Sequence, residues 1–258
     1  MIDFHNHTIP NLDDGPKSVD VALNMYKVAE QQGITDVINT VHYQHSKMEN
    51  KDTSYDYIIS EIKKFNKILK NNSININIHA ASEVYYKPNL TEILDNPITT
   101  FCNGKYMLVE FHTILLPDNY KNEFYKLMLK GVTPIVAHPE RYRFVQNDIS
   151  LVEEWVQLGY LIQIDCGSIL GHFGENTEKI TNLLIKKNLC HLIGSDAHND
   201  KKRNFCLYET YMKISEKYGN DYKDFLMKNA SKLLNFQSIN SFVEKKRTSL
   251  FKKFLGKL

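Results

Sequence analysis

The fold is decided by the first 42 residues, which read MIDFHNHTIPNLDDGPKSVDVALNMYKVAEQQGITDVINTVH. Two apolar runs of strand length, Met1–His5 and Asp36–Val41, flank a segment whose apolar residues recur three and four positions apart. Ser18 is a typical N-cap residue for a helix in that segment, and Gly33 is a typical residue at its end. The stretch therefore predicts a strand, a helix and a second strand, the unit from which parallel sheets are built.

The same alternation continues through the rest of the chain. Five further runs are predicted as strands: Ile74–Ala81, Tyr106–Glu110, Thr133–Ala137, Tyr160–Asp165 and Leu189–Gly194. Helical patterns lie at residues 58–69, 124–131, 150–159, 180–184, 208–218 and 222–235, and Ser150 with Glu153 is predicted to form a capping box. Strands that alternate with helical crossovers predict an α/β fold, either an open sheet or a barrel, in a single domain covering residues 1–240.

Composition excludes several classes of protein. The chain has 258 residues and a net charge of +2, so it lacks the basic excess of a nucleic-acid-binding protein, and its 42% hydrophobic content is too high for a disordered one. It has no run of eighteen apolar residues, and its N-terminus does not resemble a signal peptide. Four widely spaced cysteines without a C-x-x-C pair favour buried, reduced thiols. We expect a cytoplasmic globular protein, with its oligomeric state left open.

The last eighteen residues, 241–258, differ from the rest. A basic cluster at 245–247 precedes apolar residues at helical spacing, with Lys252, Lys253 and Lys257 on the opposite side. This pattern is typical of a helix on anionic lipid, which would bring residues 245–258 to the inner face of the membrane. It more often means a solvated helix packed on the domain or on a partner subunit, so both interpretations stay open.

Histidines and carboxylates fall where the predicted strands end. The first strand ends in His5-Asn6-His7, and residues two apart share one side of an extended chain, so both imidazoles can meet one ion. Metal-ligand side chains also occur at or beyond other strand ends and in the loop after the first strand: Asp14, His42, Glu83, Glu110, His138, Asp196 and His198. In a parallel barrel these ends lie on one face, where barrels carry their active sites. The pattern predicts a shared metal centre.

These nine ligands are more than one ion uses. A catalytic ion takes three or four protein ligands, so the set predicts two or three ions with a bridging carboxylate. Clustered divalent ions suit phosphoryl chemistry, because they neutralise phosphate oxygens and supply a hydroxide at neutral pH. Arg141 and Arg203, with Arg143 as a third candidate, are predicted on the same face, where guanidinium groups bind phosphate bidentately.

Four motifs, in order along the chain, carry a resemblance to a known family. They read MIDFHNH at residues 1–7, LDDGPKS at 12–18, AHPERY at 137–142 and GSDAH at 194–198. Together they resemble the PHP (polymerase and histidinol phosphatase) superfamily, and within it the CpsB/CapC/YwqE branch of bacterial capsule-associated protein-tyrosine phosphatases. Val41 and His112 stand where that branch usually has proline.

The resemblance implies a distorted (β/α)7 TIM-like barrel and a trinuclear site, usually supplied with manganese, although iron, zinc or magnesium occur in the superfamily. It implies three ligand sets, of which the first two share Glu83: His5, His7, Glu83 and Asp196; Glu83, Glu110 and His138; and Asp14, His42 and His198. It also implies that Arg141 and Arg203 bind the phosphate. The expected substrates are tyrosine autokinases of capsular and exopolysaccharide synthesis, and the leaving tyrosinate would take its proton from His42, His198 or a water on the ions.

Other functions stay open beside this one. The same barrel would suit histidinol phosphate or another small phosphomonoester, or a non-catalytic, metal-stabilised scaffold for a kinase tail. Amidohydrolases also open with His-x-His, but the phosphate-binding arginines would then have no role. A cysteine-based tyrosine phosphatase has arginine six residues after its nucleophile. The corresponding residues here are Leu108, His172, Asp196 and Met212, which argues against that mechanism.

Overall fold

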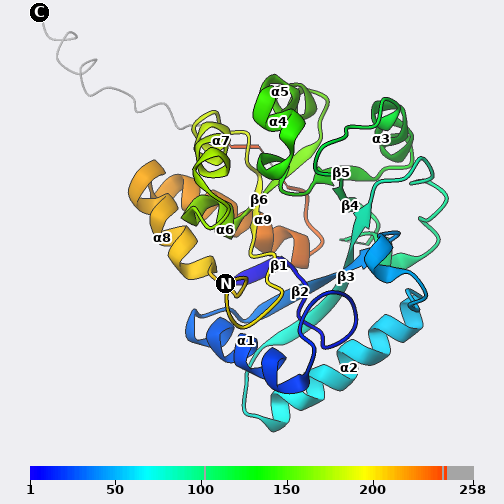
Figure 1. Cartoon of the computed structure of the whole chain (residues 1–258), viewed down its shortest axis with the longest axis vertical. Helices are drawn as coiled ribbons and strands as arrows, with labels where there is room; N and C mark the ends of the chain where they lie inside the picture. Colours follow the sequence, from blue (N-terminus) through cyan, green and yellow to red (C-terminus); the bar gives the residue numbers. More distant parts are fainter. Residues whose placement is uncertain (102, 240, 243–258) are drawn as a thin grey trace, which may run out of the picture.

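The computed structural model describes residues 1–101, 103–239 and 241–242. This part of the chain contains seven parallel strands, each hydrogen-bonded to the next in sequence order (Figure 1). Their bounds are Ile2–Asn6 (β1), Asp36–Tyr43 (β2), Asn77–Tyr85 (β3), Tyr106–Glu110 (β4), Thr133–Val136 (β5), Leu161–Asp165 (β6) and Leu192–Gly194 (β7). The predicted seven-stranded α/β fold is therefore confirmed, and it is a nearly closed barrel rather than an open sheet.

The barrel is closed by the segment that follows β7. The backbone N–H of Asp196 donates to the carbonyl oxygen of His5 at 2.8 Å, and the N–H of His7 donates to the carbonyl oxygen of Ala197 at 2.8 Å. Gly194 permits this approach, because a Cβ at that position would lie 2.5 Å from the Cβ of His5. The two histidines of the first strand thus lie next to the end of the seventh.

Helices cover the outside of the barrel (Figure 1). They are α1 (Val19–Gln31), α2 (Tyr55–Asn71), α3 (Tyr120–Leu129), α4 (Arg143–Asn147), α5 (Ser150–Gln157), α6 (Cys166–Leu170), α7 (Glu175–Lys186), α8 (Leu207–Tyr218) and α9 (Asn220–Leu234), with 3-10 turns at Ser46–Met48, Pro97–Thr99 and Pro139–Arg141. The predicted helical segments are all present. The short helices α4 and α6 were not predicted, because five residues carry too little periodicity.

Three local predictions are wrong. Ser150 does not cap α5, since its N–H and hydroxyl both donate to the Asp148 carboxylate, which lies two residues earlier. The third strand begins at Asn77 rather than Ile74, because the N–H of Ile74 donates to the carbonyl of Leu69 at the end of α2. The seventh strand begins at Leu192 rather than Leu189, because the N–H of Leu189 donates to the carbonyl of Leu184 in α7. An apolar run that ends a helix cannot be distinguished from the start of a strand by its composition alone.

The barrel interior is packed with one apolar residue or more from every strand. The smaller of the two core clusters contains Phe4, Ile38, Ala81, Leu108, Ile135, Leu161 and Leu192, together with Leu233 of α9. In β1 the register against β2 shifts by one residue between Asp3 and Asn6. This bulge explains how Phe4 joins the interior cluster while its neighbour His5 also turns toward the barrel axis, since an uninterrupted strand would place neighbours on opposite faces.

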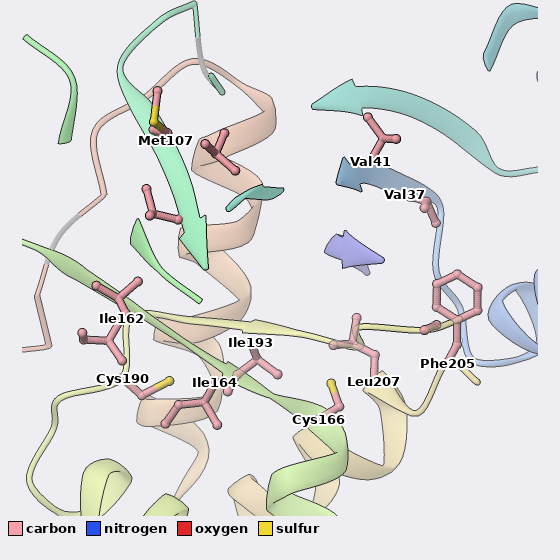
Figure 2. Packing of buried hydrophobic residues seen from close by; sticks show 14 of the residues in the cluster. Val37, Val41, Met107, Ile162, Ile164, Cys166, Cys190, Ile193, Phe205 and Leu207 are labelled. Atoms are coloured by element: carbon pink, nitrogen blue, oxygen red, sulfur yellow. The ribbon is translucent and has the colours of Figure 1, made fainter. Parts of the chain in front are cut away.

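A larger core cluster packs the helices onto the strands, and Figure 2 shows part of it around Ile162, Ile164 and Ile193. Cys166 and Cys190 are buried within it, and Cys206 is half-buried. All three are free thiols, as predicted for the cysteines that the structure describes.

The predicted amphipathic tail at 241–258 lies outside the described residues, apart from Ser241 and Phe242. Phe242 packs against Tyr222 and Phe225 of α9. Among the helices that the structure does describe, none has the length and apolar character needed to cross a membrane.

Candidate metal centre

The carboxyl-terminal mouth of the barrel brings together all nine side chains predicted as metal ligands. Seven are buried, whereas Asp14 and Glu110 are half-buried at the edge. They form four overlapping groups, in each of which the ligand atoms lie within 4.8 Å of one another: His7, Asp14, His42 and His198; His5, His7 and Asp196; His5, Glu83 and His138; and His42, Glu83 and Glu110.

Glu83 lies in the middle of this cluster. Its Oε1 is 2.9 Å from His138 Nε2 and 3.3 Å from His5 Nε2. Its Oε2 is 3.2 Å from His42 Nδ1 and 3.3 Å from His7 Nε2. A carboxylate with imidazoles on both oxygens has the geometry of a bridge between two ions.

Several inward-facing atoms of the cluster have no hydrogen-bond partner among the described residues. His5 Nε2, His7 Nε2 and His198 Nε2 are examples, although each lies close to a carboxylate. His7 Nε2, for instance, is 3.5 Å from Asp196 Oδ1 and the two atoms do not align as donor and acceptor. Because buried polar atoms are normally paired, ligand atoms that converge without bonding one another fit shared divalent cations.

The other ring nitrogens of these histidines are held from outside the cluster. His7 Nδ1 lies 2.6 Å from Asp13 Oδ2, and His198 Nδ1 lies 2.8 Å from the carbonyl oxygen of Asp196. These acceptors require a proton on Nδ1, which leaves Nε2 with its lone pair facing the cluster. The arrangement is typical of histidines that bind metal ions.

Gln163 of β6 connects the cluster to its surroundings. Its Oε1 accepts from the backbone N–H of His138 at 3.1 Å and from Nδ1 of His5 at 3.0 Å, and its Nε2 donates to Asp165 Oδ1 at 3.0 Å. Since the backbone N–H only donates and the carboxylate accepts, the orientation of the amide and the tautomer of His5 are both fixed. The side chain is fully buried.

Two arginines lie against the cluster. Arg141 Nη1 donates to Asp165 Oδ2 and to Asp196 Oδ2, both at 2.8 Å, and its guanidinium stacks over Phe173 with the ring centroid 4.9 Å away. Arg203 Nη2 donates to the same oxygen of Asp196. Arg143, the third candidate, is exposed and lines a separate cavity of about 430 Å³ beside Arg141. Both predicted phosphate-binding arginines are therefore placed at the cluster.

The electrostatics of the cluster favour cations. Burial alone would lower the pKa of His5. The charges of Glu83 and Asp196 outweigh this effect and raise the pKa of His5 to about 9. Burial and the charge of Glu83 raise the pKa of Glu110 to about 7. A divalent cation that binds at either of these two groups would displace the proton held there.

Lys47 already places a positive charge at the outer edge of the cluster. Its Nζ lies 2.6 Å from Asp14 Oδ2 and 3.0 Å from His42 Nε2. The ammonium group thus occupies a position between two of the predicted ligands where a metal cation could bind. This observation and the unpaired ligand atoms agree that the donor set fits metal ions.

Two of the predicted ligands adopt left-handed backbone conformations. His138 has φ of 33° and Asp196 has φ of 49°, and each lies two residues beyond the end of a strand. Non-glycine residues rarely adopt such angles, and they concentrate at functional sites. The turns redirect the chain so that both side chains reach the barrel axis.

Sequence reasoning missed the residues that hold the ligands in place. Asp13, Lys47, Gln163 and Asp165 were not predicted as site residues. Asp165 was detectable, because it ends the sixth strand in the same way that Glu110 ends the fourth. For Gln163 there was no comparable signal.

Four other histidines are not among the nine predicted ligands. His45 lies at the rim, stacked on His42 with ring centroids 4.8 Å apart, and His112 is exposed beside it in the same cleft. His79 pairs with Asp36 at the opposite end of the barrel, and His191 is buried.

Comparison with known proteins identifies the family. The family model for the CpsB/CapC proteins of capsular polysaccharide synthesis matches residues 1–235. The chain belongs to the CpsB/CapC family. This CpsB/CapC protein is 33% identical to CapC of Staphylococcus aureus over 212 residues, 82% of each chain. It is 32% identical to the tyrosine-protein phosphatase YwqE of Bacillus subtilis (strain 168) over 240 residues, 93% of each chain.

Solved structures agree with this assignment. A chain from crystal structures of YwqE of Bacillus subtilis and CpsB of Streptococcus pneumoniae, described as unique metal-dependent tyrosine phosphatases, matches with a TM-score of 0.89. It is 31% identical, and the match covers 94% of this chain and 97% of that one. A phosphotriesterase homology protein of Escherichia coli matches with a TM-score of 0.59 at 11% identity, which shows a shared barrel alone.

Proposed function

We propose that this CpsB/CapC protein is a metal-dependent phosphatase that hydrolyses phosphotyrosine. The observation that carries the proposal is the direct bonding of Arg141 and Arg203 to Asp196, a member of the ligand cluster. Guanidinium groups fixed at a polynuclear centre are what a phosphate monoester requires, because they complement its non-bridging oxygens. The names of the relatives as tyrosine phosphatases support the choice of phosphotyrosine over histidinol phosphate.

We propose that the nine clustered side chains hold two or three divalent ions, with manganese as the expected metal. When bound, such ions neutralise the charge of a phosphate group and supply a nucleophile from water at neutral pH. Side chains next to the cluster would position the phosphate ester beside these ions. Arg141 is fixed by Asp165 and Asp196, and Arg203 Nε has no partner among the described residues, so it remains free to donate to a phosphate oxygen.

The open edge of the cluster is where the leaving group departs. His42 and His198 flank Asp14 there, each with Nε2 3.3 Å from Asp14 Oδ1. A tyrosinate leaves with a pKa of about 10, so it needs little proton transfer in the transition state. We assign that proton to this side of the site, from His42, His198 or water.

The physiological substrate that we propose is a phosphorylated tyrosine kinase of capsule synthesis. The family description, capsular polysaccharide synthesis, supports this process. Residues 1–240 would form the catalytic unit, and residues 245–258 would contact the inner face of the membrane where such a kinase acts.

The test combines metal analysis with turnover of defined esters. We expect elemental analysis to find at least two divalent ions per chain. Chelation should abolish hydrolysis of a phosphotyrosine peptide, Mn²⁺ should restore it, and histidinol phosphate should be a poor substrate. An enzyme that stays active in chelator and is inhibited by a thiol alkylator would contradict the proposal.

Paired variants separate chemistry from folding. Asp196→Asn removes a cluster carboxylate and should abolish turnover. Asp36→Asn is the matched control, because Asp36 binds His79 at the other end of the barrel and should leave turnover unchanged. A scaffold would keep its cellular role in the Asp196 variant, whereas a phosphatase would lose it.

A further inference from the structure

A cleft of about 950 Å³ opens from the metal centre over the ends of β2, β3 and β4. Its inner end is formed by Glu110 of the cluster and by His45, which stacks on His42. Cavities of roughly 300–1,000 Å³ accommodate drug-sized ligands. The cleft therefore has room for several residues beyond the single phenyl phosphate that the centre itself would hold.

Polar groups in this cleft lack partners. Both Gln44 Nε2 and Gln44 Oε1 are without a hydrogen bond among the described residues, and so is Asn89 Oδ1, although these atoms are shielded from water. Leaving such buried groups unpaired destabilises the protein. A primary amide offers one donor side and one acceptor side, which is the complement of a peptide backbone.

The backbone of Gln44 is also unusual. Its φ is 59°, in the left-handed region, two residues after the cluster histidine His42. Non-glycine residues hold this conformation where the surrounding structure enforces it, commonly at ligand-binding sites. The strain and the unpaired amide occur in one residue that lines the cleft.

Apolar side chains continue the cleft outward. Tyr43 and Tyr85 line it next to His45, whose ring meets Tyr85 edge-to-face at 4.9 Å. The loop after β4 contributes Thr113 to the lining, and the next two residues in the chain, Ile114 and Leu115, are 66% and 65% exposed. These two aliphatic side chains directly follow a lining residue and are accessible to a bound peptide.

We propose that this cleft binds the peptide segment next to the phosphotyrosine, with the amides of Gln44 and Asn89 turned to its backbone and Ile114 and Leu115 against an apolar side chain. The inference rests on the proposed phosphatase function and deepens it. It assigns to these cleft residues the binding of the polypeptide around the phosphotyrosine.

The test is a selectivity ratio, kcat/KM for a phosphotyrosine peptide divided by kcat/KM for p-nitrophenyl phosphate. In the double variant Gln44→Ala, Asn89→Ala we expect this ratio to fall at least tenfold, mainly through KM for the peptide. Asn176→Ala is the matched control, because Asn176 lines the separate cavity on the other side of Arg141. It should leave the ratio unchanged.

A second variant protects the test against misfolding. Leu115→Ser changes an exposed side chain, so it should fold normally and still lower the ratio. An unchanged ratio in both variants, with both esters hydrolysed, would refute the peptide cleft and leave the phosphatase function intact. If the wild-type protein hydrolysed neither ester, the proposed function would fail first and the cleft proposal with it.

Discussion

Replacing Gln163 by leucine should remove the contacts that hold the predicted metal ligands in position on the barrel. Leucine has nearly the same volume, so packing changes little, but the three hydrogen bonds to His5, His138 and Asp165 are lost. Each of the three stranded buried groups costs about 1–3 kcal/mol, so we expect a loss of roughly 3–9 kcal/mol in the free energy of unfolding. Domains are stable by about 5–15 kcal/mol, so a loss in the lower half of that range leaves the variant folded.

The more specific consequence concerns metal binding. Without Gln163, His5 is free to rotate and to change tautomer, and loss of such an outer partner typically lowers metal affinity by about 10–100-fold. We expect a rise of this size in the Kd for Mn²⁺, measured by calorimetric titration of the protein after a chelator has removed its metal ions. The kcat on p-nitrophenyl phosphate at saturating Mn²⁺ should also fall, because Asp165 no longer holds Arg141 in one position.

Gln32→Leu is the matched control for this experiment. Gln32 is also a glutamine with two structural hydrogen bonds, to Phe205 and Tyr208, but it lies on the outer surface between α1 and α8. It should lose stability without any change in Mn²⁺ affinity. If Gln163→Leu behaved like Gln32→Leu, the role assigned to Gln163 as the residue that orients the ligands would be wrong.

Three further outcomes follow from the same geometry. Because Glu110 has a pKa raised to about 7 and must be ionised to bind metal, Mn²⁺ affinity measured by calorimetry should rise between pH 6 and pH 8, and a flat profile would contradict its role as a ligand. Arg141→Lys should lower kcat/KM for aryl phosphates by on the order of 100-fold, since lysine cannot reproduce the planar contacts, whereas near wild-type kinetics would exclude phosphate binding there. Burial lowers the pKa of His191 to about 4, so this residue stabilises the fold above pH ~6.5 and the contribution is lost as the pH falls through 4; His191→Asn, whose side-chain oxygen can still accept from the N–H of Ile162, should flatten that part of the urea-unfolding profile, and an unchanged slope would count against it.

The strands, and the side chains that cluster at their ends, were predictable because both are encoded locally. An apolar run of strand length followed by His42, Glu110 or Asp196 combines two signals that lie within a few residues of each other. The parallel barrel then brings all strand ends to one face, whatever the details of packing. Predicting that these side chains converge therefore required no knowledge of the register between strands.

The outer partners depend on register, which the sequence does not reveal. Gln163 reaches His5 across 158 residues of chain, and it does so beside a bulge in β1 that turns His5 inward. Lys47 and Asp13 act through loops whose course is set by tertiary contacts. The failure at Ser150 has a different, local origin, because the carboxylate of Asp148, two residues earlier, accepts from both the N–H and the hydroxyl of Ser150.

The way the barrel closes implies that the centre exists before any ion is bound. Asp196 is placed by its own backbone hydrogen bond to His5 and by Arg141 and Arg203, none of which involves an ion. The interior cluster, with a residue from every strand, supplies the packing that a metal-dependent fold lacks. We therefore expect the metal-free protein to keep its far-ultraviolet circular dichroism and the fluorescence emission of its single tryptophan, the buried Trp155. It should nevertheless lose all phosphatase activity. Unfolding on chelation would show instead that the ions hold the barrel together, as they do in small zinc domains.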